Sequence, residues 1–182
     1  MDDTQQLPSF GPEVSLVRPA YVDPTARLYG KVSLGEECSL WPYSVIRAEA
    51  LDVQIGRYVN MQDHSMIHIG YGTGVVIGDY CSITHKATIH GALIGENTLV
   101  GINATVMDGA VIGANCIVGG HCLVPEGMHV PDNSVVVGVP AASECSRTLP
   151  ARGAGRLRPG TPAPLSSVTW RRLNVAGRFR PG

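Results

Sequence analysis

Three histidines in the middle of the chain have the residue type and the spacing of a metal site. His68 closes a stretch that begins at Asn60, and His85 and His90 lie in a second stretch that ends at Gly91. Three neutral imidazoles and one open position form the ligand set of a catalytic zinc ion. Such a set binds an ion only if the backbone holds the rings in place, so the surrounding elements must position them.

A six-residue period identifies those elements. An aliphatic residue recurs every six positions, and a slim residue such as Ala104 often follows four positions later. This pattern is typical of a hexapeptide parallel β-helix, in which three short strands make a triangular coil of about 18 residues. Each coil buries little surface alone, so the stacking of coils must supply the core. The aliphatic positions are Leu16, Val22, Leu28, Leu34, Leu40, Ile46, Ile55, Met61, Ile67, Ile77, Ile83, Ile89, Ile94, Val100, Val106, Ile112, Val118, Val124, Val130 and Val136.

The interruptions of this period all flank the histidines. Three residues are inserted within 47–54, four are inserted within 68–76, and one is missing within 90–93. Insertions in a solenoid lie at its corners and often on its binding face. The repeats that follow run without interruption, so the pattern indicates a site grafted onto a regular scaffold.

The repeat also predicts where the histidines point. His68 and His90 each follow an inward aliphatic residue, and they are separated by one coil plus the four-residue insertion. They should point outward at the same corner, at the strand spacing of about 4.8 Å. His85 lies one face earlier, across a corner, and cannot easily share their ion within one chain. If three protomers pack side by side, His85 of a neighbour could complete the set, and metal binding would then require a trimer.

Other interpretations of the histidines stay open at this point. His64, His121 and His129 fall at variable repeat positions and are interpreted as ordinary exposed side chains. The three candidate ligands could be exposed by chance, or a single outward histidine could be the base of an acyltransferase.

The cysteines have a structural interpretation. Cys38, Cys81, Cys116 and Cys122 all fall at the slim inward position, where small apolar side chains fit. Only Cys145 lies outside the repeat. Five cysteines without paired metal-type spacing do not indicate a disulfide framework, and a reducing cytoplasm is the simplest compartment.

Composition and charge exclude several classes of protein. The 182 residues suffice for one domain, and the absence of an apolar run near 18 residues predicts no membrane span. The acidic N-terminus does not resemble a signal peptide. Residues 1–146 carry a net charge of −9, whereas residues 147–182 carry +8, all from arginine. The acidic body argues against nucleic acid as a partner.

Four segments of the chain resemble the γ-class carbonic anhydrases. They are Arg47-Ala-Glu49, Asn60-Met-Gln62-Asp63, Ile67-His68 and the stretch from Ser82 to Gly91. The resemblance extends over about residues 14–141 and includes Gly138-Val-Pro140. It implies an all-β fold, a left-handed parallel β-helix of hexapeptide repeats, and a homotrimer with metal sites between subunits. The left hand comes from the resemblance alone, because strand physics favours right-handed crossovers.

The resemblance also implies a reaction, the reversible hydration of carbon dioxide to bicarbonate, which is a lyase activity. Zn²⁺, with Fe²⁺ or Co²⁺ as alternatives, would lower the pKa of a bound water so that a metal-bound hydroxide attacks the substrate near neutral pH. His68 and His90 would bind the metal from one subunit and His85 from the next.

Further site residues follow from the same resemblance. Gln62 would hydrogen-bond the metal-bound water, and Asn60 would support the pocket. Arg47 and Asp63 match positions that form ion pairs across the interface, and a purely structural role there is an equal alternative. Glu49 stands where the family usually has aspartate, so it keeps the charge on a longer arm.

The chain also departs from the best-studied type of the family. Ala50 and Tyr71 stand where that type has glutamates that help proton transfer. The proton shuttle could therefore be Glu49, Tyr71, His64 or buffer, and whether the chain hydrates carbon dioxide depends on one of these replacing the two glutamates.

The chain divides into three segments by composition. Residues 1–13 form an N-terminal segment, residues 14–141 form the β-helix domain, and residues 142–182 form a tail rich in proline, glycine and arginine. Proline and glycine at that density oppose a helix, so the tail is expected to be flexible or loosely docked.

Two other functions remain as alternatives to the anhydrase. One is a hexapeptide-repeat acyltransferase, and the other is a non-catalytic metal-binding trimeric scaffold or ligand binder. Metal content distinguishes the acyltransferase from the anhydrase. A carbon dioxide hydration assay distinguishes the non-catalytic scaffold from the anhydrase.

Overall fold

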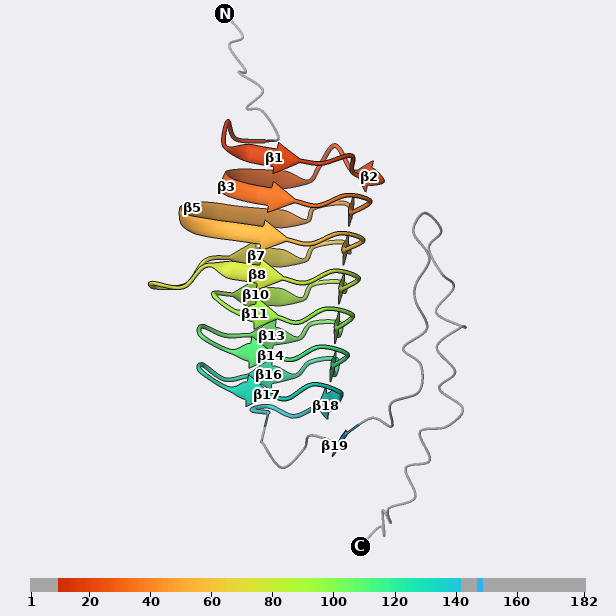
Figure 1. Ribbon diagram of the computed structural model, residues 1–182, viewed down its shortest axis with the longest axis vertical. Helices are drawn as coiled ribbons and strands as arrows, with labels where there is room; N and C mark the ends of the chain where they lie inside the picture. Colours follow the sequence, from red (N-terminus) through yellow and green to blue (C-terminus); the bar gives the residue numbers. More distant parts are fainter. Residues whose placement is uncertain (1–9, 142–146, 149–182) are drawn as a thin grey trace, which may run out of the picture.

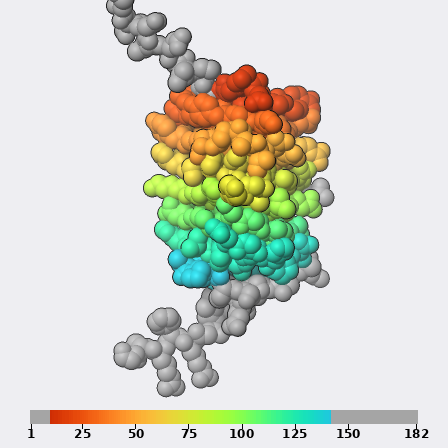
Figure 2. Space-filling view, turned by 90° about the vertical axis from the view of Figure 1, so that its left-hand side faces the viewer, coloured from red at the N-terminus to blue at the C-terminus, as the bar shows by residue number. Residues whose placement is uncertain are grey.

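The computed structural model describes residues 10–141 and 147–148, and these form a parallel β-solenoid (Figure 1). Successive coils stack along one axis in sequence order, which Figure 2 shows as an unbroken series of coloured bands. The described ranges contain no helix, and so none that is long and apolar enough to span a membrane. The predicted all-β architecture is confirmed, while its left hand stays a prediction. Most of residues 142–182, and with them the expected flexible tail, lie outside the described residues.

The strands form three faces around a triangular section, named face 1, face 2 and face 3 in chain order along one coil. Two long strands, β3 (Arg27–Leu34) and β5 (Val45–Ile55), bend from face 1 into face 2. Face 1 continues with β7 (Met66–His68), β10 (Thr88–His90), β13 (Thr105–Val106) and β16 (Leu123–Val124). Face 2 holds β1 (Val14–Leu16), β8 (Val75–Ile77), β11 (Leu93–Ile94), β14 (Val111–Ile112) and β17 (His129–Val130).

Face 3 is a second sheet, and its strand β18 is the last parallel strand of the stack. It holds β2 (Tyr21–Val22), β4 (Ser39–Leu40), β6 (Asn60–Met61), β9 (Ser82–Ile83), β12 (Leu99–Val100), β15 (Ile117–Val118) and β18 (Ser134–Val136). The short β19 (Arg147–Thr148) pairs antiparallel with β18, unlike the parallel pairs along the stack. At the other end a single bridge joins Phe10 to Leu28, so pairing begins before the predicted start at residue 14.

The predicted inward residues form one continuous core. Every aliphatic position of the six-residue series is buried except Leu16 and Val22, which are partly buried. Ala20, which occupies the slim position four residues after Leu16 and should therefore point inward, is exposed. These three residues belong to the first coil, which has a neighbouring coil on one side only. The exceptions therefore mark the open end of the stack rather than a failure of the period.

The remaining histidines occupy corners and edges, as the repeat predicts. His64 and His121 both have left-handed backbone conformations at the corner between face 3 and face 1, with φ values of 58° and 57°. His64 stacks on Tyr43, with ring centroids 5.0 Å apart. His129 is exposed on β17. All three are exposed, which agrees with the interpretation that they are surface side chains.

A first prediction tests the burial of the core against a matched exposed residue. Leu40→Ala removes a side chain that is 1% exposed, whereas Leu93→Ala removes one that is 46% exposed. We expect Leu40→Ala to lower the free energy of unfolding by about 2–5 kcal/mol, because the coils cannot collapse to fill the void. Leu93→Ala should change it by less than about 0.5 kcal/mol. Denaturant unfolding at one protein concentration measures both, and equal losses would contradict the inward placement.

A second prediction concerns the four buried thiols. Cys38, Cys81, Cys116 and Cys122 are at most 1% exposed, and burial raises the pKa of Cys38 and Cys81 to about 11. Since the thiolate is the reactive form, these residues should label with a thiol reagent only as fast as the protein unfolds. Cys145 lies outside the described residues and should be replaced by serine for the measurement. Rapid labelling of the folded variant would show that the thiols do not face inward.

Candidate metal centre

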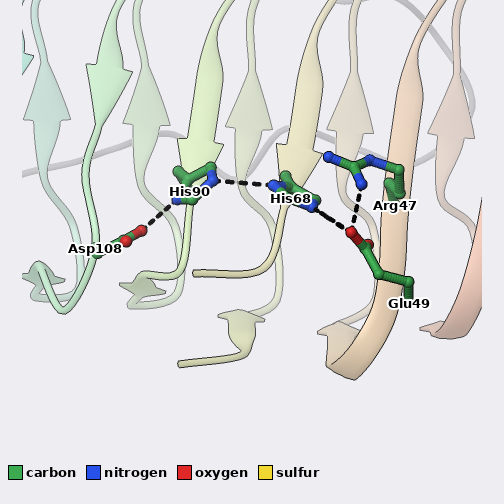
Figure 3. A network of polar contacts seen from close by, with 5 residues as sticks. All are labelled: Arg47, Glu49, His68, His90 and Asp108. Atoms are coloured by element: carbon green, nitrogen blue, oxygen red, sulfur yellow. Dashed lines mark hydrogen bonds and ion pairs between the residues drawn. The ribbon is translucent and has the colours of Figure 1, made fainter. Parts of the chain in front are cut away.

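His68 and His90 stand side by side because their strands pair in register. In the parallel pair β7–β10, Ile67 aligns with Ile89 and His68 aligns with His90. Both isoleucines are fully buried, so alternation along each strand turns both histidines outward. His68 Nδ1 and His90 Nε2 lie 2.9 Å apart (Figure 3). This juxtaposition agrees with the prediction of one corner and one coil of separation.

A carboxylate lies against the outer nitrogen of each imidazole. His68 Nε2 is 3.0 Å and 3.2 Å from the two carboxylate oxygens of Glu49, which also forms an ion pair with Arg47. His90 Nδ1 contacts Asp108 Oδ1 on the other side. The five side chains form one row across neighbouring coils, with the histidine pair in the middle (Figure 3). The hydrogen bond to His68 holds the pKa of Glu49 below its usual value, so this carboxylate is ionised at neutral pH.

The carboxylate contacts of His68 and His90 determine what can lie between the two imidazole rings. A carboxylate can only accept, so the outer nitrogens of His68 and His90 carry hydrogen. The two inner nitrogens then face each other with lone pairs, and such an approach is favourable only with a cation between them, either a proton or a metal ion. Two nitrogens bound at about 2.0–2.1 Å to one zinc ion lie about 3.3 Å apart across a tetrahedral angle. The observed separation of 2.9 Å is close to that, so the pair fits two ligands of one ion.

His85 lies apart from this pair. It follows β9 at the corner between face 3 and face 1, it is exposed, and its Nδ1 is 3.1 Å from Asp63 Oδ2. Within residues 10–141 and 147–148, no three His, Cys, Asp or Glu side chains could hold one metal ion together. One chain therefore presents two adjacent imidazoles on face 1 and a third around the corner.

Three further predicted site residues lie near His85 rather than near the histidine pair. Asn60 aligns with Ser82 in the pair β6–β9, and its side-chain oxygen accepts a hydrogen bond of 2.9 Å from Ser39. Gln62 and Asp63 follow β6 at the same corner. Asp63 contacts His85 within the chain, whereas Arg47 contacts Glu49 beside the histidine pair.

The predicted residues thus fall into two groups. The pair group consists of Arg47, Glu49, His68 and His90, and the corner group consists of Asn60, Gln62, Asp63 and His85.

The candidate proton carriers are spread over the surface. Tyr71 lies in the loop between β7 and β8, which extends outward from the stack (Figure 1), and its side chain is fully exposed. His64 lies at the opposite edge of face 1, stacked on Tyr43. Of these candidates, Glu49 contacts one of the paired histidines directly.

Asp108 is the residue that sequence reasoning missed. It lies beyond the interrupted part of the chain, among regular repeats, where no break drew attention to it. The available signal was its position 18 residues after His90, which is one coil of the solenoid.

Comparisons with known proteins agree with this fold and place the chain in a family. A family model for bacterial transferase hexapeptide repeats, six in number, matches residues 91–126. A solved hexapeptide transferase family protein from Anaplasma phagocytophilum superimposes with a TM-score of 0.69 at 28% identity, over 73% of this chain and 80% of that one. The fold therefore defines a hexapeptide-repeat protein.

Two curated relatives narrow the class further. A protein named probable carbonic anhydrase from Methanocaldococcus jannaschii is 55% identical over 115 residues, which is 63% of this chain and 72% of that protein. The γ carbonic anhydrase 1 of Arabidopsis thaliana is 34% identical over 95 residues, which is 49% of this chain and 34% of the plant protein. The chain belongs to the γ-class carbonic anhydrase family.

Proposed function

We propose that this protein catalyses the reversible hydration of carbon dioxide to bicarbonate at zinc sites between the subunits of a homotrimer. The observation that supports this most is the split of the site: two imidazoles meet on face 1, while the third candidate ligand lies on another part of the surface. A neighbouring subunit that sets its corner group against face 1 would bring all three together. The carbonic anhydrase names of the relatives support the reaction.

The residues of the pair group would hold and orient the metal. His68 and His90 would bind it through the nitrogens that face each other, and Glu49 would keep the His68 ring aligned from outside. When bound, the metal lowers the pKa of water towards 7 and so supplies a nucleophile for carbon dioxide near neutral pH. Fe²⁺ or Co²⁺ could replace zinc at a site of this donor type.

The remaining residues have roles that their chemistry allows. The side-chain amide of Gln62 offers both donors and an acceptor, which suits it to orient an oxygen atom of water or substrate. Asn60 would support the same pocket from β6, where its side-chain oxygen accepts a hydrogen bond from Ser39. Glu49 is ionised, contacts His68 and has a side chain that is 47% exposed, so it can pass a proton between the site and solvent. Arg47 steadies that carboxylate through their ion pair.

An acyltransferase is the second candidate, because the matching repeat model and the similar solved structure bear transferase names. That reaction requires a histidine base and an acyl donor but no metal. Metal analysis of the purified protein, combined with stopped-flow hydration and an acyl-CoA turnover assay, separates the two. Bound metal without hydration would instead support a metal-binding scaffold.

A third prediction tests whether the site is shared between subunits. His85→Ala and His68→Ala should each lose zinc and hydration activity while still folding, because each removes a ligand that lies on the surface. When the two inactive variants are refolded together, a site forms wherever intact His68 and His90 of one chain meet intact His85 of another. When equal amounts of the two variants assemble into trimers at random, about a quarter of the wild-type number of sites should return. Each trimer that contains both variants has one interface at which all three histidines are intact.

The measurement is zinc content and hydration rate after co-refolding, with wild-type chains refolded in parallel as the control. A mixture of His68→Ala with His90→Ala serves as the negative control, since no interface in it has both face 1 ligands from one chain. No recovery in the first mixture, alongside full recovery of the wild type, would show that the three histidines do not share a site across subunits.

A further inference from the structure

Asp108 occupies a corner that the coil-to-coil hydrogen bonds hold in place. It follows β13, and at this corner one backbone N–H and one backbone carbonyl bond to the coils on the two sides. Gly109 N–H donates to Gly91 O at 2.8 Å, and Gly127 N–H donates to Asp108 O at 2.8 Å. The Asp108 backbone is therefore fixed relative to both the coil before it and the coil after it.

Two glycines leave the space that the Asp108 carboxylate fills. A Cβ atom on Gly70 would lie 2.5 Å from Asp108 Oδ1, and one on Gly91 would lie 2.8 Å from the same oxygen. Gly91 also has a φ of +54°, which disfavours other residues. Thr73 contributes a buried hydroxyl beside the same two glycines. The carboxylate is thus enclosed, with a side chain only 28% exposed, and it faces His90 Nδ1.

We propose that Asp108 is a positioning residue for the metal site, which fixes both the orientation and the tautomer of His90. By accepting a hydrogen bond from Nδ1–H, it leaves the lone pair of His90 on Nε2, which is the nitrogen that faces His68. Without Asp108 the ring can turn and either nitrogen can carry the hydrogen, so fewer molecules present two lone pairs to one ion. The proposal rests on the metal site of the proposed function, but it does not require hydration activity.

The first measurement is zinc affinity, by competition with a chromophoric chelator, on the full-length chain. Loss of a partner of a metal-bound histidine typically weakens binding by about 10–100-fold, and we expect a loss in this range for Asp108→Ala. Asp108→Asn keeps an acceptor oxygen of similar shape and should lose less. Glu126→Ala is the matched control, because Glu126 aligns one coil further along at the same corner and is exposed. Affinities within threefold of each other for wild type, Asp108→Ala and Glu126→Ala would overturn the proposal.

The second measurement reads the tautomer directly and does not depend on metal or on activity. In metal-free protein with ¹⁵N-labelled histidine, long-range ¹H–¹⁵N correlation should show His90 with hydrogen on Nδ1 in the wild type and in Glu126→Ala. In Asp108→Ala the same residue should show a mixture of tautomers, while thermal unfolding confirms that the variant is folded. A wild-type His90 with hydrogen on Nε2 and none on Nδ1, or an unchanged tautomer in Asp108→Ala, would overturn the proposal. A protein that binds zinc as expected and does not hydrate carbon dioxide would refute the proposed function alone.

Discussion

The parallel register between successive coils is the constraint on which the site depends. In each ladder an inward aliphatic residue sits on the inward aliphatic residue of the coil below, as Ile67 does with Ile89. Sliding one strand by a single residue would turn its apolar side chains to solvent and its polar side chains into the core. The core therefore locks the register, and the locked register brings His68 and His90 to within 2.9 Å of each other. The free energy that holds the two imidazoles together comes from the burial of their isoleucine neighbours, not from the histidines themselves.

The same register explains why a single chain presents an incomplete ligand set. His85 precedes the inward residue Ile89 by four positions and His90 follows it by one, so a corner and most of a strand separate the two rings. The backbone is held in place across that distance, because β9 and β10 each pair with strands of the coils on both sides. No local rearrangement of the corner would bring His85 to the pair without breaking the ladder. A trimer would solve this by contact between surfaces, and the metal would then link assembly to chemistry.

Much of this architecture could be predicted because the repeat is short and strict. A period of six with two inward positions determines which residues form the core, and it placed the four buried cysteines and both paired histidines. It failed at the first coil, where Ala20 is exposed, since periodicity does not show where a stack ends. The repeat does not determine the hand either, because a coil of the opposite hand would bury the same residues, so the expected left hand rests on the family resemblance alone. Asp108 was missed for a different reason. It lies in regular repeats, and an aspartate at a solenoid corner is ordinary unless its neighbour in the preceding coil is known to be a ligand candidate.

The position of Asp108 gives the four-residue insertion after His68 a structural role. A hydrogen bond of 2.8 Å from Gly70 N–H to Thr73 O folds the inserted loop back on itself, and this places Gly70 and Thr73 beside Gly91. These residues line the space that the Asp108 carboxylate occupies on its way to His90. In an uninterrupted coil the chain would run directly from β7 to β8, as it does from β13 to β14, without those residues. The break in the period and the missed carboxylate therefore belong to one arrangement, in which the insertion helps to enclose the group that orients a histidine one coil away.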